Sequence, residues 1–171
     1  MKPSCEAKDV ERQEKYVCDA DSLINLHRHF RGRCTRRLRQ LAEKSKLYIP
    51  EGVARELRRG TDRLSKFIEQ RESSIVIRMK NPELLAEFTR MERAYGESIQ
   101  VGKQKHPGFW KSRAGYKAAD SQIVAVAKVF GHTVVSDDSA VKLACFLENV
   151  PCIGWTEFAR RLGLAKQLRL F

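Results

Sequence analysis

The chain has 171 residues and a formal net charge of +12, with 42% hydrophobic and 8% aromatic residues. This length and apolar content suit a single globular domain. No early apolar run resembles a signal peptide, and no stretch approaches the roughly 18 apolar residues of a membrane-spanning helix. The five cysteines are odd in number and lack zinc-binding spacing, which indicates reduced thiols. We therefore expect a cytoplasmic protein without a membrane partner.

The positive charge is concentrated in two segments. Residues 28–46 contain eight Lys or Arg and one Glu, and residues 103–117 contain five Lys or Arg and no acid. These segments hold the whole excess, and the rest of the chain is balanced. Such concentration indicates a polyanionic partner, most simply nucleic acid. The alternative is a solvated basic surface that serves solubility.

The predicted elements alternate between short strands and helices. Residues 1–14 are polar without periodicity and are expected to form a flexible N-terminal extension, and residues 15–171 a single domain. Strands are expected at 16–18, 47–49, 74–78, 133–135 and 152–154, and helices at 23–30, 35–44, 50–60, 61–71, 81–98, 118–130, 139–148 and 157–162. Residues 102–116 lack an apolar period and are expected to be a loop. Because parallel strands need crossover connections, this order predicts a three-layer α/β/α sandwich with a central, mainly parallel sheet.

The stretch from 118 to 138 places acids where an ordinary core would not. At about 100° per residue, one face of helix 118–130 carries only apolar residues, and Asp120 lies at the edge of that face. The apolar residues are Ala119, Ile123, Val126, Ala127 and Phe130. The next strand ends in Ser136, Asp137 and Asp138. Partly buried carboxylates are costly unless they are paired, hydrogen-bonded or bound to a metal, so this unit indicates a cation.

Acidic side chains are predicted to meet at the carboxyl ends of the strands, where ligands bind in such sheets. The four principal candidates are Asp19, Glu56, Asp120 and Asp138. Further candidates at the same edge are Asp21, Ser136 and Asp137. Oxygen ligands without His or Cys suit Mg²⁺ or Mn²⁺, and the chemistry that fits a basic protein is phosphodiester hydrolysis.

Each acid also has an ordinary structural explanation. Asp19, Asp21 and Asp138 stand where helix N-caps belong, and capping is the better explanation for any one of them alone. Glu56 can pair with an arginine on its own helix, and Asp120 can cap its helix or accept a hydrogen bond from a lysine. Capping does not explain why four acids reach one end of a sheet.

The ordered motifs resemble the PIN-domain nucleases, among them the VapC-like toxin ribonucleases. The chain has Asp-Ala-Asp-Ser-Leu at 19–23, Pro-Glu-Gly-Val-Ala-Arg-Glu-Leu at 50–57, Asp-Ser-Gln-Ile-Val-Ala at 120–125 and Ser-Asp-Asp at 136–138. The resemblance runs from about residue 16 to residue 162. Each motif is weak alone, but the ordered set is fairly specific.

The resemblance implies a metal-dependent endoribonuclease with a PIN-like fold. In this interpretation Asp19, Glu56, Asp120 and Asp138 hold one or two Mg²⁺ or Mn²⁺ ions and carry the catalysis. The substrate would be single-stranded or structured RNA. Many relatives are toxins of toxin–antitoxin modules, so the resemblance also implies an antitoxin partner and a homodimer.

Basic and aromatic residues are predicted to hold the RNA. They are Lys103, Lys105, Trp110, Lys111, Arg113 and Lys117 in the second basic segment, and Arg36, Arg37 and Arg39 in the first. Basic groups contact phosphates, and exposed aromatic rings stack on unpaired bases. The alternative is that Phe109 and Trp110 lie in the core and the charges are solvated.

Two other functions compete with the nuclease. The first is a catalytically silent nucleic-acid-binding or scaffold protein that keeps the fold. The second is a site like that of phosphotransfer receivers, which also cluster acids at strand ends. The receiver is disfavoured because the chain lacks both a lone acceptor Asp after a central strand and a later strand ending in Lys.

Overall fold

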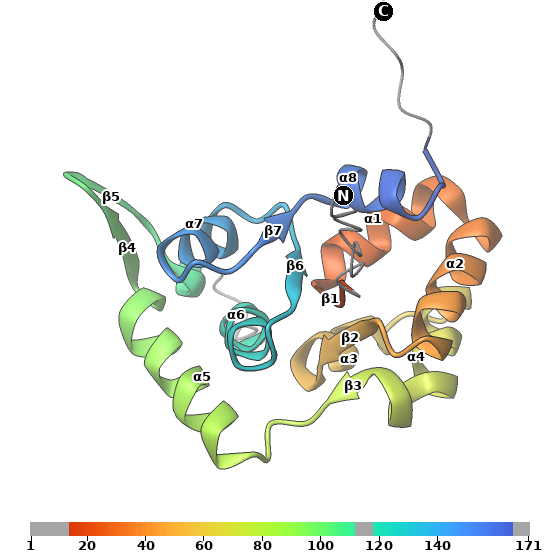
Figure 1. Cartoon of the computed structure of the whole chain (residues 1–171), viewed down its shortest axis with the longest axis horizontal. Coiled ribbons are helices and arrows are strands. Elements are labelled where there is room, and N and C mark those ends of the chain that lie inside the picture. Colours follow the sequence, from red (N-terminus) through yellow and green to blue (C-terminus); the bar gives the residue numbers. More distant parts are fainter. Residues whose placement is uncertain (1–13, 112–117, 166–171) are drawn as a thin grey trace, which may run out of the picture.

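The computed structural model describes residues 14–111 and 118–165 and is built on a five-stranded parallel sheet (Figure 1). The strand order is β3-β2-β1-β6-β7, and every neighbouring pair is parallel. Tyr16 of the central strand lies opposite Leu47 on one side and Thr133 on the other. The strands are β1 (Tyr16–Cys18), β2 (Leu47–Pro50), β3 (Val76–Ile77), β6 (Thr133–Val135) and β7 (Cys152–Ile153).

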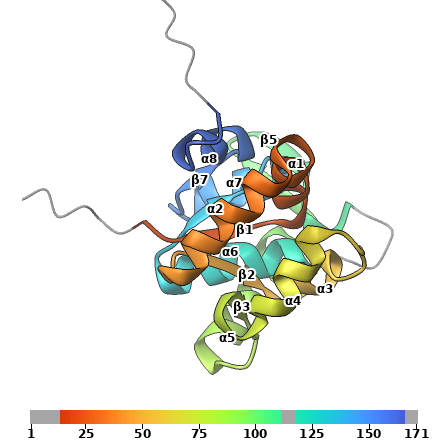
Figure 2. The same cartoon turned by 90° about the vertical axis from the view of Figure 1, so that its right-hand side faces the viewer.

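Helices cover both faces of this sheet, which confirms the predicted three-layer α/β/α sandwich. Helices α1, α2, α4 and α8 lie on one side and α5, α6 and α7 on the other (Figures 1 and 2). Helix α3 follows β2 directly at the carboxyl end of that strand. The helices are α1 (Ala20–Phe30), α2 (Gly32–Glu43), α3 (Glu51–Leu57), α4 (Arg63–Ile75), α5 (Pro82–Tyr95), α6 (Ala118–Phe130), α7 (Ser139–Leu147) and α8 (Trp155–Arg161).

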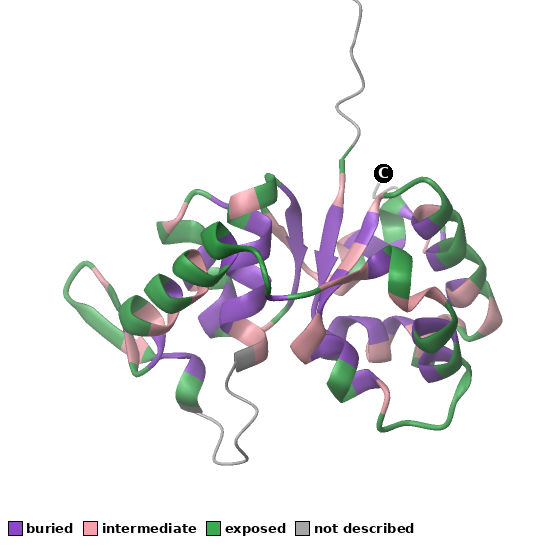
Figure 3. Ribbon diagram, turned by 90° about the horizontal axis from the view of Figure 1, so that it is seen from below, coloured by how far each residue is buried: buried purple, intermediate pink, exposed green. Residues whose placement is uncertain are grey.

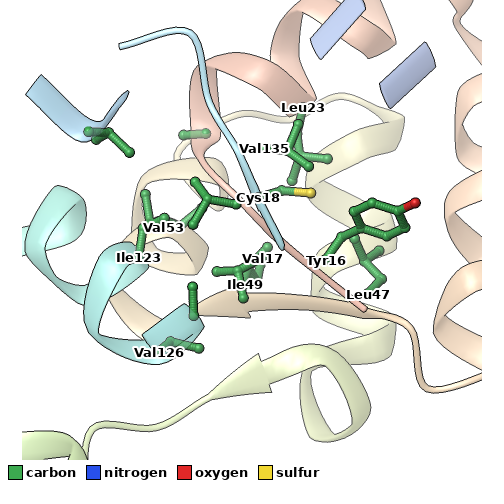
Figure 4. Packing of buried hydrophobic residues seen from close by; sticks show 14 of the residues in the cluster. Tyr16, Val17, Cys18, Leu23, Leu47, Ile49, Val53, Ile123, Val126 and Val135 are labelled. Carbon is green, nitrogen blue, oxygen red and sulfur yellow. The ribbon is translucent and has the colours of Figure 1, made fainter. Parts of the chain in front are cut away.

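The hydrophobic core surrounds the central strands. The middle of the molecule is buried and the outer faces of the helices are exposed (Figure 3). Val17 and Ile49 of the sheet, Val53 of α3 and Ile123 of α6 pack together in this core (Figure 4). Because α3 and α6 share this packing, the core fixes the two helices that carry Glu56 and Asp120.

Helix α6 is buried on more sides than the single apolar face predicted for it. All residues from 121 to 127 are buried, so the helix lies between other helices and the sheet. Phe130, predicted on the apolar face, is 44% exposed because it lies in the last turn, beyond that packing.

Several predicted helix boundaries were wrong because caps and turns set them. Helix α1 begins at Ala20, three residues earlier than predicted, because Asp19 caps it. The break before α2 lies at Arg31, whose φ is 46°, so Gly32 is already helical. Helix α4 extends through Ile75 into the predicted third strand and leaves only two residues for β3. Helix α8 begins at Trp155, two residues earlier than predicted, with Gly154 as its N-cap.

The segment predicted as the end of a helix and a loop is instead a β-hairpin. Helix α5 ends at Tyr95, and β4 (Ser98–Val101) pairs antiparallel with β5 (Gln104–Pro107), followed by a 3₁₀ turn at Phe109–Lys111. Gly102 has a φ of 59°, which gives the left-handed turn between the strands. The hairpin extends away from the body of the molecule (Figure 1).

The predicted flexible extension lies outside the described residues, except for its last residue. Glu14 accepts hydrogen bonds from Tyr16, Thr133 and Arg161 at 2.6 to 3.0 Å, so the chain is held from this point on. The cysteines within the described ranges are free thiols. In the described part of the chain, no helix is both long and apolar enough to span a membrane.

Candidate active site

Asp19 lies at the carboxyl end of the central strand and is 7% exposed. Its backbone N–H donates to Val135 of the adjacent strand at 3.1 Å, and its Oδ1 accepts from the N–H of Ser22 at 2.7 Å. Burial raises the pKa of Asp19 above its usual value, although hydrogen bonds from Ser136 and Ser22 oppose the shift. The predicted capping role of Asp19 is therefore present, but the cap leaves a buried carboxylate whose ionised form is disfavoured.

Ser136 connects Asp19 to the end of the neighbouring strand β6. It is fully buried, and its N–H donates to Ile153 of β7 at 2.9 Å. Its Oγ accepts from the N–H of Asp138 at 3.1 Å, and its hydroxyl also bonds the carboxylate of Asp19. Through its backbone N–H and its hydroxyl, Ser136 thus joins the ends of three adjacent strands.

Two more acids lie close enough to Asp19 to affect one another's ionisation. Asp21 is exposed in the first turn of α1, and Glu56 is exposed on α3. Partial burial raises the pKa of Glu56, and the charges of Asp21 and Asp19 raise it further, while Arg59 lowers it. Asp19, Asp21 and Glu56 therefore lie within electrostatic reach of one another.

The two acids after β6 have different partners. Asp138 caps α7 by accepting from the N–H groups of Ala140 at 2.9 Å and Val141 at 3.1 Å. Asp137 accepts from Lys142 at 3.2 Å and from the N–H of Trp155 at 3.0 Å. Asp137 therefore joins the end of β6 to the first turn of α8, while Asp138 sets the start of α7.

Asp120 is half-buried in the first turn of α6. Its neighbours fix that turn on both sides. Ser121 donates a hydrogen bond to Glu92 of α5, and Oε1 of Gln122 accepts from the N–H of Gly52 in α3 at 2.9 Å. Asp120 is thus held beside the helix that carries Glu56.

The contacts of Gln122, Gly52 and Glu92 are positioning contacts that the sequence motifs did not predict. A Cβ at Gly52 would lie 2.8 Å from Oε1 of Gln122 and 3.3 Å from Cα of Ala119, so any larger residue would displace this contact. The only sequence signal was a glycine in the first turn of a helix, where it is otherwise unfavourable.

The donor set fits a hard divalent cation in its chemistry. Among the described residues no three His, Cys, Asp or Glu side chains lie close enough to hold a metal ion as they stand. The nearby acids supply only oxygen. Burial raises the pKa of Glu56 most, and a bound cation would offset the further effect of the Asp21 and Asp19 charges. Asp19, Glu56, Asp120 and Asp138 remain the residues predicted to hold Mg²⁺ or Mn²⁺.

The aromatic pair after the hairpin is divided between core and surface. Phe109 is 1% exposed and packs in the core, as the alternative interpretation predicted. Trp110 is 42% exposed, and its Nε1 donates to Glu92 at 2.6 Å. Because Glu92 also accepts from Ser121, the exposed ring is linked to the turn that carries Asp120.

The predicted RNA-binding lysines and arginines are only partly described. Lys103 and Lys105 are exposed on the hairpin. The side chain of Lys111 and all of Arg113 and Lys117 lie outside the described residues. The predicted arginines Arg36, Arg37 and Arg39 are all exposed on α2.

Comparisons with known proteins identify a family but not an activity. No curated protein matches the chain. The structure of PAE2754 from Pyrobaculum aerophilum is 18% identical, covers 89% of this chain and 98% of its own, and has a TM-score of 0.49. The structure of FitAB bound to the IR36 DNA fragment is 18% identical, covers 82% and 94%, and has a TM-score of 0.47. At these values neither structure supports a statement about activity. The profile of one family matches residues 16–165, and the chain therefore belongs to that family, described as a domain of unknown function (DUF4411).

Proposed function

We propose that this protein is a metal-dependent endoribonuclease of the PIN-domain type. One observation carries the proposal: the buried carboxylate of Asp19 lies within electrostatic reach of Asp21 and Glu56 at the carboxyl edge of a parallel sheet. A structural cap does not require other acids nearby, and their repulsion disfavours folding unless a cation offsets it. The order of the motifs and the basic charge of the chain support the same function.

A divalent cation at this edge would be held by Asp19, Glu56, Asp120 and Asp138. When bound, it would neutralise a phosphate and lower the pKa of a water molecule. Exclusively oxygen donors favour Mg²⁺ or Mn²⁺ over softer metals.

The chain's own groups would orient the carboxylates of the site. The N–H of Ser22 and the hydroxyl of Ser136 fix the carboxylate of Asp19. The hydrogen bond from the N–H of Gly52 to Oε1 of Gln122 holds the turn that carries Asp120 against the helix that carries Glu56.

Partners and location are proposals that rest on the motif resemblance and on composition. An antitoxin that covers the acidic edge and a second copy of the chain are the proposed protein partners. RNA is the proposed substrate, and the cytoplasm is the proposed location.

A second candidate function is nucleic-acid binding without catalysis. It is favoured by the capping roles of Asp19 and Asp138 and by the absence, within the described residues, of a ready-made cluster of three metal ligands. Metal-dependent cleavage distinguishes the two functions.

The test is RNA cleavage by the purified full chain with Mg²⁺ or Mn²⁺ and with EDTA. Cleavage should require the metal and disappear in Asp19→Asn and in Asp120→Asn. The matched control is Glu83→Gln, which removes an exposed carboxylate from α5 and should leave cleavage unchanged. The metal should also raise the melting temperature of the unaltered chain, because saturation at 100 times Kd adds about 2.7 kcal/mol of stability. Full turnover by Asp120→Asn, or cleavage in EDTA, would refute the proposal.

A further inference from the structure

A continuous groove with basic walls runs between α1, α2 and α4. One cavity of about 330 Å³ lies between α2 and α4, and a second of about 710 Å³ lies between α1, the start of α2 and the turn before α4. Arg63 and Lys66 line both cavities, so the two form one groove. We call it the basic groove, and its six cationic residues are Arg28, Arg31, Arg36, Arg39, Arg63 and Lys66.

The positive charge of the basic groove is not neutralised within the described chain. None of the six cations forms an ion pair with a described residue, whereas Arg58, Arg90 and Arg161 elsewhere all do. The groove contains one acid, Asp62, which accepts from the N–H and Oγ of Ser65. Six clustered cations repel one another, so this arrangement indicates an external anion.

A buried polar atom in the wall also has no partner. His27 lines the larger cavity, and its Nδ1 lies 3.7 Å from Oδ2 of Asp62. Its Nε2 is buried and forms no hydrogen bond with the described chain. A buried ring nitrogen without a partner is costly, and a bound ligand can supply one.

The groove is continuous with the acidic edge along α1. Asp21 and Arg28 are seven residues apart, so they lie about 20° apart around α1 and about 10 Å apart along its axis. Helix α3, which carries Glu56, leads into Thr61 and Asp62 at the wall of the groove. A polymer that crosses the acidic edge can therefore continue along α1 into the groove without leaving the surface.

The arginines of α2 do not all belong to this groove. Arg36 and Arg39 line the cavity against α4, where Arg63 approaches the start of α2 beside Gly32. Arg37 instead lines a third cavity with Leu164 and donates to Gln40 at 3.1 Å, and Arg36 lines both this cavity and the groove. Helical phase thus directs Arg39 and Arg37 toward different cavities, with Arg36 at the boundary between them.

We propose that the basic groove binds the sugar–phosphate backbone of the single-stranded nucleic acid on one side of the bond that is cut. The inference rests on the proposed nuclease function for the identity of the polymer. Arginine binds phosphate through a planar fork of donors, and most of the groove's cations are arginines. From Asp21 to Arg28 along α1 and from Gly32 to Arg39 along α2, the path is roughly 20 Å, which spans several nucleotides of a single strand. Substrates shorter than this lose contacts with the groove.

The test compares two pairs of charge removals in the full chain. Arg39→Ala with Arg63→Ala removes two exposed cations from the groove. Lys80→Ala with Arg93→Ala removes one exposed cation just before α5 and one on it, and α5 lies across the sheet from α2 and α4 (Figure 1). A second groove pair, Arg39→Gln with Arg63→Gln, keeps polar side chains in place. Melting temperatures establish that all variants fold.

Binding is measured by fluorescence anisotropy in EDTA, so that cleavage does not enter. The probes are single-stranded RNA and DNA about twelve nucleotides long, which exceeds the path even at the roughly 3.4 Å rise of a fully stacked strand. For the groove pairs, affinity should fall and the slope of log affinity against log salt should flatten by about 1.4, which is 0.7 for each lost phosphate contact. The α5 pair should lose much less.

Three outcomes would overturn the inference. They are unchanged binding in the groove pairs, equal losses in both locations, and displacement of RNA by poly-glutamate at equal charge concentration. A loss of DNA binding equal to that of RNA supports a shared backbone site, and a loss for RNA alone supports an RNA site. If RNA is cleaved but the groove pairs bind normally, the groove inference fails alone. If the groove pairs lose binding and no metal supports cleavage, the nuclease proposal fails alone.

Discussion

Replacing Asp19 by Asn is expected to keep or raise the free energy of unfolding at neutral pH, although Asp19 caps α1. Asn caps helices as well as Asp does, so the 2.7 Å hydrogen bond from the N–H of Ser22 should persist. The substitution removes a charge that burial and Asp21 disfavour. Asp19→Ala also removes the cap, which should cost about 1 kcal/mol.

The pH dependence follows from the direction in which the pKa is displaced. The pKa of Asp19 in the folded protein is raised above its usual 3.8, mainly by burial, so the folded state binds the proton more tightly than the unfolded state. The contribution of Asp19 to the free energy of unfolding is therefore greatest below pH 3.8. It falls as the pH rises from 3.8 through the raised pKa of the folded protein, and it stays low at neutral pH. Asn does not titrate, so the stability of the variant relative to the unaltered chain should rise over that window. A tenfold difference in proton affinity between the folded and unfolded states corresponds to about 1.4 kcal/mol.

Asp62 provides a matched control, because it is also an N-cap. Its Oδ1 accepts from the N–H of Ser65 at 2.9 Å, and hydrogen bonds from Ser65 lower its pKa. The contribution of Asp62 to the free energy of unfolding is present above pH 3.8. It is lost as the pH falls through the lowered pKa of Asp62 in the folded protein. Asp62→Asn should therefore reduce stability at neutral pH, by less than about 1 kcal/mol because the side chain is largely exposed.

Urea denaturation of both Asn variants and Asp19→Ala, at about pH 4 and pH 7, measures these differences. The reasoning is refuted if Asp19→Asn loses as much stability at neutral pH as Asp19→Ala. It is also refuted if the two Asn variants change stability in the same direction.

Three further predictions concern residues outside the acidic edge. Phe109→Ala should lower the free energy of unfolding by about 3 to 5 kcal/mol and leave RNA affinity unchanged. Trp110→Ala should lower it by only about 1 kcal/mol but weaken RNA binding. Equal losses of stability for the two variants in urea denaturation would contradict this prediction. Burial acts to raise the pKa of Glu148, but hydrogen bonds from two basic residues and a tyrosine outweigh it and lower the pKa from 4.5 to about 2. Glu148→Gln should therefore cost on the order of 3 kcal/mol at neutral pH and progressively less as pH falls from 4.5 towards 2, and a loss that does not depend on pH would contradict this. Lys103→Ala with Lys105→Ala should change stability by less than about 0.5 kcal/mol but flatten the salt dependence of RNA binding, and an unchanged slope would exclude the hairpin from the interface.

Local sequence signals predicted the sheet better than they predicted the hairpin. Each strand of the parallel sheet is a short apolar run between helices, and strands 16–18 and 133–135 were predicted to the residue. The first residue of strand β4 was predicted as the end of a helix. Only Ile99 of this strand is buried, so the sequence shows no alternating apolar pattern there, and the strand is defined by its pairing with β5. Phe109 and Trp110 are adjacent and both aromatic, so only their tertiary contacts could show that Phe109 lies in the core and Trp110 at the surface.

The sequence by itself determined the order of the elements, the parallel sheet and the place of Asp19, Ser136 and Asp138 at the ends of its strands. These features depend on local signals, namely the spacing of apolar residues and the residues that begin or end a helix or strand. The tertiary structure decided which acids affect one another, how Gly52 and Gln122 hold α6 against α3, and how α2 and α4 form one basic groove. These features depend on distances between segments far apart in the chain, and a one-residue change in helix start or phase alters the direction of a side chain.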